Sequence, residues 1–220
     1  MALLIGYPDI PWRAVEKQST VNAFSPVFPI GNLSYGERYQ FAVTTNSNAA
    51  LQVMYDLGVG VTQTVGYLII ARADKLRASG MTTIELANSP GGLAGSYTSQ
   101  WSISDLASRT LYGPRSEDLL ISGLNLSTGR GWNFYGAGAS PTTWAVNKIY
   151  FGRGFEMGSE PTDFTIDYEP ASLSQFEAES GAKHLARTDE PRYRFSYEWS
   201  GVTDAKTREW QNTIARYQHR

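Results

Sequence analysis

The chain has 220 residues, of which 41% are hydrophobic and 18% charged, and its formal net charge is −2. This composition is that of an ordinary globular protein and excludes a disordered chain, and the lack of a basic surplus argues against a nucleic-acid partner. Because there is no cysteine, disulfides, thiolate metal sites and cysteine nucleophiles are excluded. No apolar window approaches the ~18 residues of a membrane span, so we expect no membrane insertion.

Residues 1–30 predict an extended N-terminal arm. Short apolar patches alternate there with Pro8, Pro11, Pro26 and Pro29. Proline lacks the N–H that a central strand donates, so this segment suits an edge or an irregular lead-in. We expect the arm to pack either on its own domain or on a neighbouring chain.

A series of short strands is predicted after the arm. In LQVMYDL, Leu51, Val53 and Tyr55 share one face, which is typical of a half-buried strand. In TVGYLIIARA both faces are apolar, so this strand is expected to be covered on both sides. Further strands are expected at ERYQFAVT, TTIELAN, AVNKIYFGRGF, DFTIDYEP and RYRFSYEW. Many short strands separated by Gly, Pro, Asn and Ser predict an all-β sandwich or barrel.

The remaining segments are predicted to be connections or helix. Residues 88–102 and the Gly-rich stretch GLNLSTGRGWNFYGAGASPTTW are expected to be irregular connections, and residues 170–191 a polar linker. Residues 201–220 predict a C-terminal helix, because Thr203 suits an N-cap and apolar residues follow at helical spacing.

The strand-rich middle of the chain resembles a known fold family. LQVMYDLGVGVTQTVGYLIIARADKLRASGMTTIELANSP is similar to the core of galactose-binding-like (discoidin-type) domains. WAVNKIYFGRGFEMG and RYRFSYEWSGVTDAKTREW resemble the closing part of such domains in bacteriophage tail proteins. The resemblance covers roughly residues 35–215 and implies a jelly-roll β-sandwich over residues 31–200.

The resemblance also implies a function. It favours a non-enzymatic structural component of a phage virion, at the tail tip or baseplate, assembled in the host cytoplasm. Its partners would be other phage tail proteins and further copies of the chain. Calcium is compatible with the family, but the sequence names no ligands for it, and no cofactor is predicted.

Catalytic signals are weak. His184 falls in the predicted linker and His219 is the penultimate residue, and neither adjoins a nucleophile motif. Asp163 and Asp167 share one face of a predicted strand, and two carboxylates roughly 5–10 Å apart could hydrolyse a glycoside. A solvated strand face is the simpler explanation of this pair.

Aromatic and arginine side chains in the expected connections form the candidate binding surface. Three explanations remain open: rings that stack on a glycan, a protein–protein interface, or tryptophans that plug the sandwich. A carbohydrate-binding adhesion module for a host-surface glycan is therefore the first alternative to virion assembly, and a glycan hydrolase is the second. The candidate residues are Trp101, Arg130, Trp132, Tyr135, Trp144 and Arg153.

Overall fold

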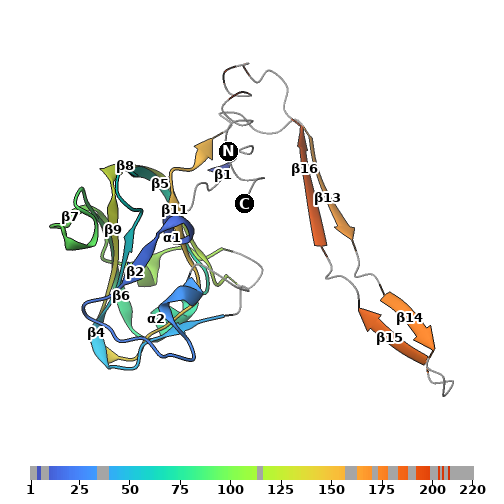
Figure 1. Ribbon diagram of the computed structural model, residues 1–220, viewed down its shortest axis with the longest axis horizontal. Helices are drawn as coiled ribbons and strands as arrows, with labels where there is room; N and C mark the ends of the chain where they lie inside the picture. The colour runs from blue at the N-terminus through green and yellow to red at the C-terminus, as the bar shows by residue number, and fades with distance from the viewer. Residues whose placement is uncertain are drawn as a thin grey trace. The chain divides into compact units, whose positions relative to one another are not determined.

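The computed structural model describes residues 4–5, 10–33, 40–112, 116–156, 163–169, 173–177, 183–187 and 192–198, together with Thr203, Ala205 and Arg208. Contacts divide the chain into two compact units. One spans Leu4–Phe155 and is a β-sandwich (Figure 1). The other comprises Met1–Leu3 and Glu156–Arg220.

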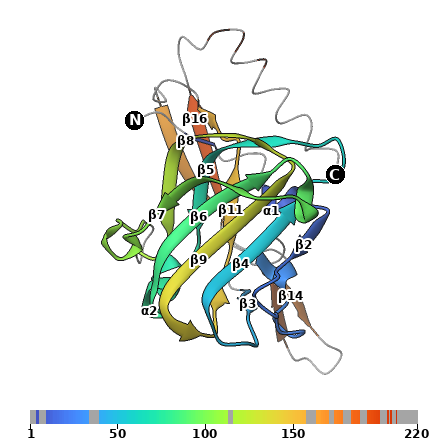
Figure 2. The same ribbon diagram turned by 90° about the vertical axis from the view of Figure 1, so that its left-hand side faces the viewer.

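One layer of the sandwich is a five-stranded antiparallel sheet, which Figure 2 shows face-on with β9 at its centre. The alternation of side chains along β4 points Leu51, Val53 and Tyr55 into the core, where all three are fully buried, as the sequence predicted. In spatial order the strands are Glu16–Gln18 (β2), Asn48–Asp56 (β4), Gly131–Thr142 (β9), Met81–Ser89 (β6) and Thr98–Ile103 (β7).

The second layer is a three-stranded antiparallel sheet with a short extra pair beside it. Tyr67 and Leu68 point to opposite faces of the middle strand, β5, and both are buried, so this strand is covered on both sides as predicted. The sheet consists of Ile149–Gly152 (β11), Gln63–Ile70 (β5) and Leu119–Gly129 (β8). The extra pair is Ala42–Val43 (β3) with Ala145–Val146 (β10).

Aromatic side chains from both layers meet in the core. Phe151 on β11 contacts Tyr55 on β4 with ring centroids 5.4 Å apart, and Trp132 on β9 at 6.2 Å. Both contacts are edge-to-face, the geometry that aromatic quadrupoles favour. All three rings are fully buried, and their contacts link the two sheets.

The predicted arm packs on its own domain. Ile10, in the short helix α1 (Ile10–Arg13), is fully buried in the core, and β2 pairs with β4 at the edge of the five-stranded sheet. The arm also contains Leu4–Ile5 (β1), which pairs with Phe155–Glu156 (β12), and ends at the 3₁₀ turn Ile30–Leu33 (η1). Within the described part of the chain, no helix has the length and apolar character needed to cross a membrane.

Two expected connections contain regular structure instead. Residues 88–102 include the 3₁₀ turn Gly92–Ala94 (η2) and most of β7, and the Gly-rich stretch forms the β8–β9 hairpin. Glycine is required there by close packing: a Cβ on Gly131 would lie 2.8 Å from the carbonyl oxygen of Gly92. Sequence reasoning took these glycines for loop residues, whereas they let backbones approach one another.

The second unit contains two antiparallel strand pairs. Asp163–Glu169 (β13) pairs with Arg192–Glu198 (β16), so the strands expected at DFTIDYEP and RYRFSYEW exist but pair with each other. Within residues 170–191, where a polar linker was expected, Leu173–Glu177 (β14) pairs with Lys183–Arg187 (β15). Most of the predicted C-terminal helix lies outside the described residues; Ala205 and Arg208 are helical.

We expect Trp132→Ala to lower the free energy of unfolding by about 3–5 kcal/mol, because it opens a cavity where the two sheets meet. Urea denaturation followed by circular dichroism measures this change. Trp12→Ala is the matched control: Trp12 is 38% exposed, so about 1 kcal/mol is expected. Equal losses for the two variants would contradict the structure.

Candidate functional site

Two of the candidate tryptophans lie inside the sandwich. Trp132 and Trp144 are both fully buried. Each satisfies its indole N–H internally: Trp132 donates to the carbonyl of Gly129 at 3.2 Å, and Trp144 donates to the carbonyl of Asn48 at 3.0 Å. Neither ring can stack on a ligand, so the plug explanation applies to these two residues.

Arg130 is committed to an internal ion pair. It occupies the turn between β8 and β9, and its Nε and Nη2 donate to the two carboxylate oxygens of Asp56, each at 2.8 Å. Asp56 also accepts from the backbone N–H of Gly58 at 2.8 Å. The Arg130 guanidinium is the main cause that lowers the pKa of Asp56, so this carboxylate stays ionised.

The other three candidates are dispersed. Trp101 is half-buried on the edge strand β7 and packs against the core. Tyr135 is half-buried and lies on the opposite face of β9 from Trp132, in register with Gln52 and Glu85. Arg153 follows β11 and is exposed. The structure therefore does not gather the six residues into one surface.

The residues considered for catalysis lie on strands of the second unit, apart from His219. Asp163 and Asp167 lie on the same face of β13, in register with Glu198 and Arg194. His184 lies on β15 rather than in a linker, and His219 lies outside the described residues.

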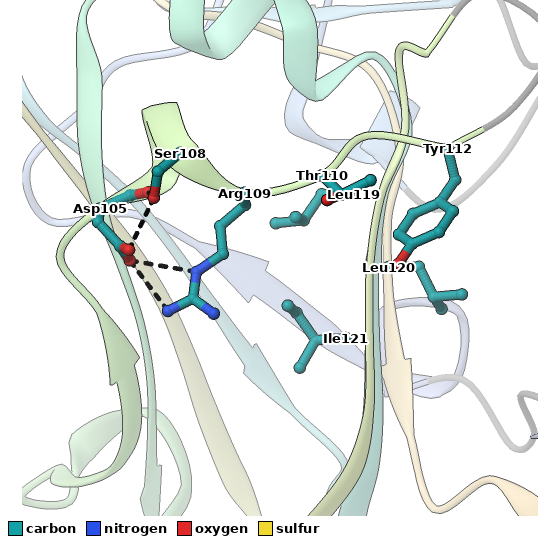
Figure 3. Close-up of a pocket in the computed structure, with 8 residues that line it drawn as sticks. All are labelled: Asp105, Ser108, Arg109, Thr110, Tyr112, Leu119, Leu120 and Ile121. Carbon is teal, nitrogen blue, oxygen red and sulfur yellow. Dashed lines mark hydrogen bonds and ion pairs between the residues drawn. The ribbon is translucent and has the colours of Figure 1, made fainter.

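A pocket of about 310 Å³ is present elsewhere, at the start of β8 (Figure 3). β8 is an edge strand of the three-stranded sheet, and the segment after β7 runs beside it. This volume lies at the lower end of the range of small-molecule sites. The described lining residues are Asp105, Ser108, Arg109, Thr110, Tyr112, Leu119, Leu120 and Ile121.

Its polar side is an ordered ion pair. Arg109 donates from Nε and Nη2 to the same oxygen of Asp105, at 3.1 and 2.9 Å. The hydroxyl of Ser108 donates to the other carboxylate oxygen at 2.7 Å. Ser108 and then Arg109 lower the pKa of Asp105, so the pocket presents one ionised carboxylate and one fixed guanidinium.

Its apolar side follows β8. Figure 3 draws Ile121 on the side of Arg109, and Leu120 beside the Tyr112 ring on the other side of the strand. Tyr112 is 49% exposed and Leu120 37%, whereas Leu119 is buried. The pocket therefore combines directional polar groups with exposed apolar and aromatic surface.

The chain that lines the pocket is held at Arg109 and at Asp118 by the short helix α2 (Ala73–Ala78) and its N-cap residue, Arg72. At one end, Arg77 donates through Nη2 to the carbonyl of Arg109. At the other, the backbone N–H of Arg72 donates to Asp118 at 3.0 Å, and its side chain pairs with Glu117 at 3.1 Å. Before Arg109, Leu106 in the 3₁₀ turn Leu106–Ser108 (η3) is fully buried and anchors the turn.

Sequence reasoning missed this pocket. The segment SDLASR carried a usable signal, because an aspartate three residues before a serine is typical of an ordered turn. That pattern predicts the turn but not the strand that it faces. β7, which precedes the turn, belongs to the five-stranded sheet, whereas β8 belongs to the three-stranded one. In the part of the chain that the structure describes, no three acidic or histidine side chains gather where they could hold a metal ion.

Comparison with known proteins gives structural matches alone. No family model matches the chain, and no curated protein does. A chitosan-binding module of a chitosanase/glucanase from Paenibacillus sp. IK-5 matches with a TM-score of 0.50 and 9% identity, over 67% of this chain and 100% of the module. This likeness confirms an all-β jelly-roll sandwich of the galactose-binding-like type.

Two structures of carbohydrate-binding modules from Clostridium perfringens match with lower scores. The CBM32-1 and CBM32-2 domains of ZmpB, in complex with GalNAc, have a TM-score of 0.48 and 9% identity, over 69% of this chain and 39% of theirs. The family 32 module of NanJ, in complex with galactose, has a TM-score of 0.45 and 12% identity, over 66% of this chain and 98% of its own.

These matches correct the functional prediction. The resemblance to galactose-binding-like domains is confirmed, but the predicted role as a structural component of a phage virion is wrong, since the Paenibacillus structure of the same fold is a chitosan-binding module. This match lends no support to phage tail partners or to an oligomer. The physical reason is that the strand pattern encodes the sandwich, and a sandwich pattern carries no information on where the protein works.

Asp56→Asn tests the internal ion pair through pH. Because Arg130 depresses the folded-state pKa of Asp56, the pair stabilises the fold above the ordinary aspartate pKa of ~3.9, and this contribution is lost as the pH falls through the lower folded value. We expect the variant to be about 2 kcal/mol less stable at pH 7, with the difference shrinking below about pH 4.

Thermal denaturation across pH 2.5–7 measures this difference. Asp105→Asn is the control, because solvent screens its half-exposed ion pair with Arg109, so little stability should be lost at any pH. A gap for Asp56→Asn that stays constant with pH would contradict the assignment.

Proposed function

We propose that this chain is a carbohydrate-binding module and that the pocket at the start of β8 is its glycan site. The observation that carries the proposal is the pairing, in one pocket, of the fixed Asp105–Arg109 couple with the exposed Tyr112 and Leu120. The fold agrees with this reading, because the Paenibacillus module of the same fold is a chitosan-binding one.

A sugar ring has two kinds of surface, and the pocket has a group for each. Its hydroxyls both donate and accept, and they can pair with an ionised carboxylate and a guanidinium. Its C–H faces are apolar and pack on an aromatic ring or an aliphatic side chain. Because Asp105 and Arg109 orient each other before any ligand arrives, little side-chain entropy would be lost on binding.

The proposal assigns binding and no catalysis. Hydrolysis of a glycosidic bond needs a protonated carboxylic acid opposite a second carboxylate. In this pocket Asp105 is kept ionised by Ser108 and Arg109, which lower its pKa, and it is the one acidic side chain among the described lining residues. Such a site can hold a glycan but has no group that protonates a leaving oxygen.

Substitutions in the pocket test the proposal. Glycan-array screening should identify a ligand, with galactose, N-acetylgalactosamine and glucosamine oligomers as the first probes. We expect Arg109→Ala and Tyr112→Ala each to weaken that ligand by about tenfold or more in isothermal titration calorimetry, corresponding to about 1.4 kcal/mol.

The matched controls are Arg153→Ala and Tyr135→Ala. Both remove the same residue types from outside the pocket, and both belong to the surface that the sequence predicted. Affinity should stay within about twofold for each. Loss of binding in the controls, with the pocket variants unaffected, would place the site elsewhere.

A further inference from the structure

Arg109 uses one edge of its guanidinium and leaves another open. A guanidinium has five N–H donors. Asp105 accepts from Nε and from Nη2 with one oxygen, which takes the side edge of the group. Figure 3 shows the third nitrogen, Nη1, pointing away from Asp105 and toward Ile121.

The open edge is a two-pronged donor. It consists of one N–H on Nη1 and the second N–H on Nη2, which lie parallel and at fixed separation. Within the described part of the chain, these groups donate to no acceptor. Parallel N–H pairs of this kind match the two oxygens of a carboxylate and form a bidentate, charge-assisted pair.

The surrounding charges do not oppose an anion at this edge. Asp105 lies on the opposite side of the guanidinium, and Ser108 already donates to its second oxygen. Arg77 brings a second guanidinium to the backbone of this turn, where it donates to the carbonyl of Arg109. The described lining residues beyond the ion pair are uncharged, so a ligand carboxylate would meet no second acidic group there.

We infer that the pocket selects sugars that carry a carboxylate, with the open edge of Arg109 as the group that recognises it. This inference rests on the proposed glycan site and narrows it to a ligand class. The sugar ring would lie against the side chains along β8, and the carboxylate would point at Nη1 and Nη2. Uronic acids and sialic acids share this chemistry.

The test compares sugars that differ in the carboxylate alone. Galacturonic acid and galactose differ at C6, and calorimetry or ligand-observed NMR gives the affinity of each. We expect galacturonic acid or its oligomers to bind at least about tenfold more tightly than the neutral counterpart. Sialic acid is tested separately, because it carries a carboxylate on a different kind of sugar.

Arg109→Lys is the decisive variant. Lysine keeps the positive charge but has no planar fork, so the ratio of acidic-sugar affinity to neutral-sugar affinity, measured on the same variant, should fall to about twofold or less. Arg153→Lys is the control and should keep the preference.

The outcomes separate the two proposals. Equal binding of acidic and neutral sugars by the wild type, or a preference that survives Arg109→Lys, overturns the inference and leaves the glycan site standing. No binding of any sugar, acidic or neutral, overturns the proposed function and the inference with it.

Discussion

The contact of Phe151 with Tyr55 and Trp132 is the constraint on which the sandwich depends. Phe151 belongs to the three-stranded sheet, and the two other rings belong to the five-stranded one. Because β9 carries Trp132 and continues directly from β8, fixing this ring also fixes the hairpin that crosses between the layers. Arg130 in the hairpin turn is then clamped by Asp56.

This frame sets the position of the pocket. β8 begins at the apolar side of the candidate pocket and ends at the turn that holds Arg130. Leu120 and Ile121 are placed by pairing with Ile69 and Leu68 of β5. The facing segment is held by the buried Leu106, by Arg77 of α2 and by Arg72, the N-cap residue of that helix. A loop site on rigid supports is the usual way in which a sandwich gains a binding function.

Much of this fold could be read from the sequence, because alternating burial is a local property. β4, β5 and β6 appear where the apolar alternation placed them, and the galactose-binding-like sandwich follows from them. α2 was missed because six residues are too few for a helical period to be recognised. The β8–β9 hairpin was missed because glycines in closely packed strands look like loop glycines.

The site was harder to predict than the fold. Trp132 and Trp144 attracted attention as large aromatics among glycines, yet burial decides whether a ring can bind, and burial depends on pairing between distant strands. The ion pair of Asp105 and Arg109 is local and leaves a trace in sequence. Its apolar partner, β8, comes from another segment, and nothing in the turn itself indicates that they meet.

One measurement tests most directly whether glycans bind at the start of β8. Methyl NMR spectra of Leu120 and Ile121, recorded during titration with the glycan that the array identifies, report on the pocket itself. Val59, which is 86% exposed on a different turn, serves as an internal reference. Saturable shifts of the Leu120 and Ile121 methyl signals, with Val59 unchanged, are the expected result. Binding that shifts other methyl groups and leaves these two unaffected would contradict it.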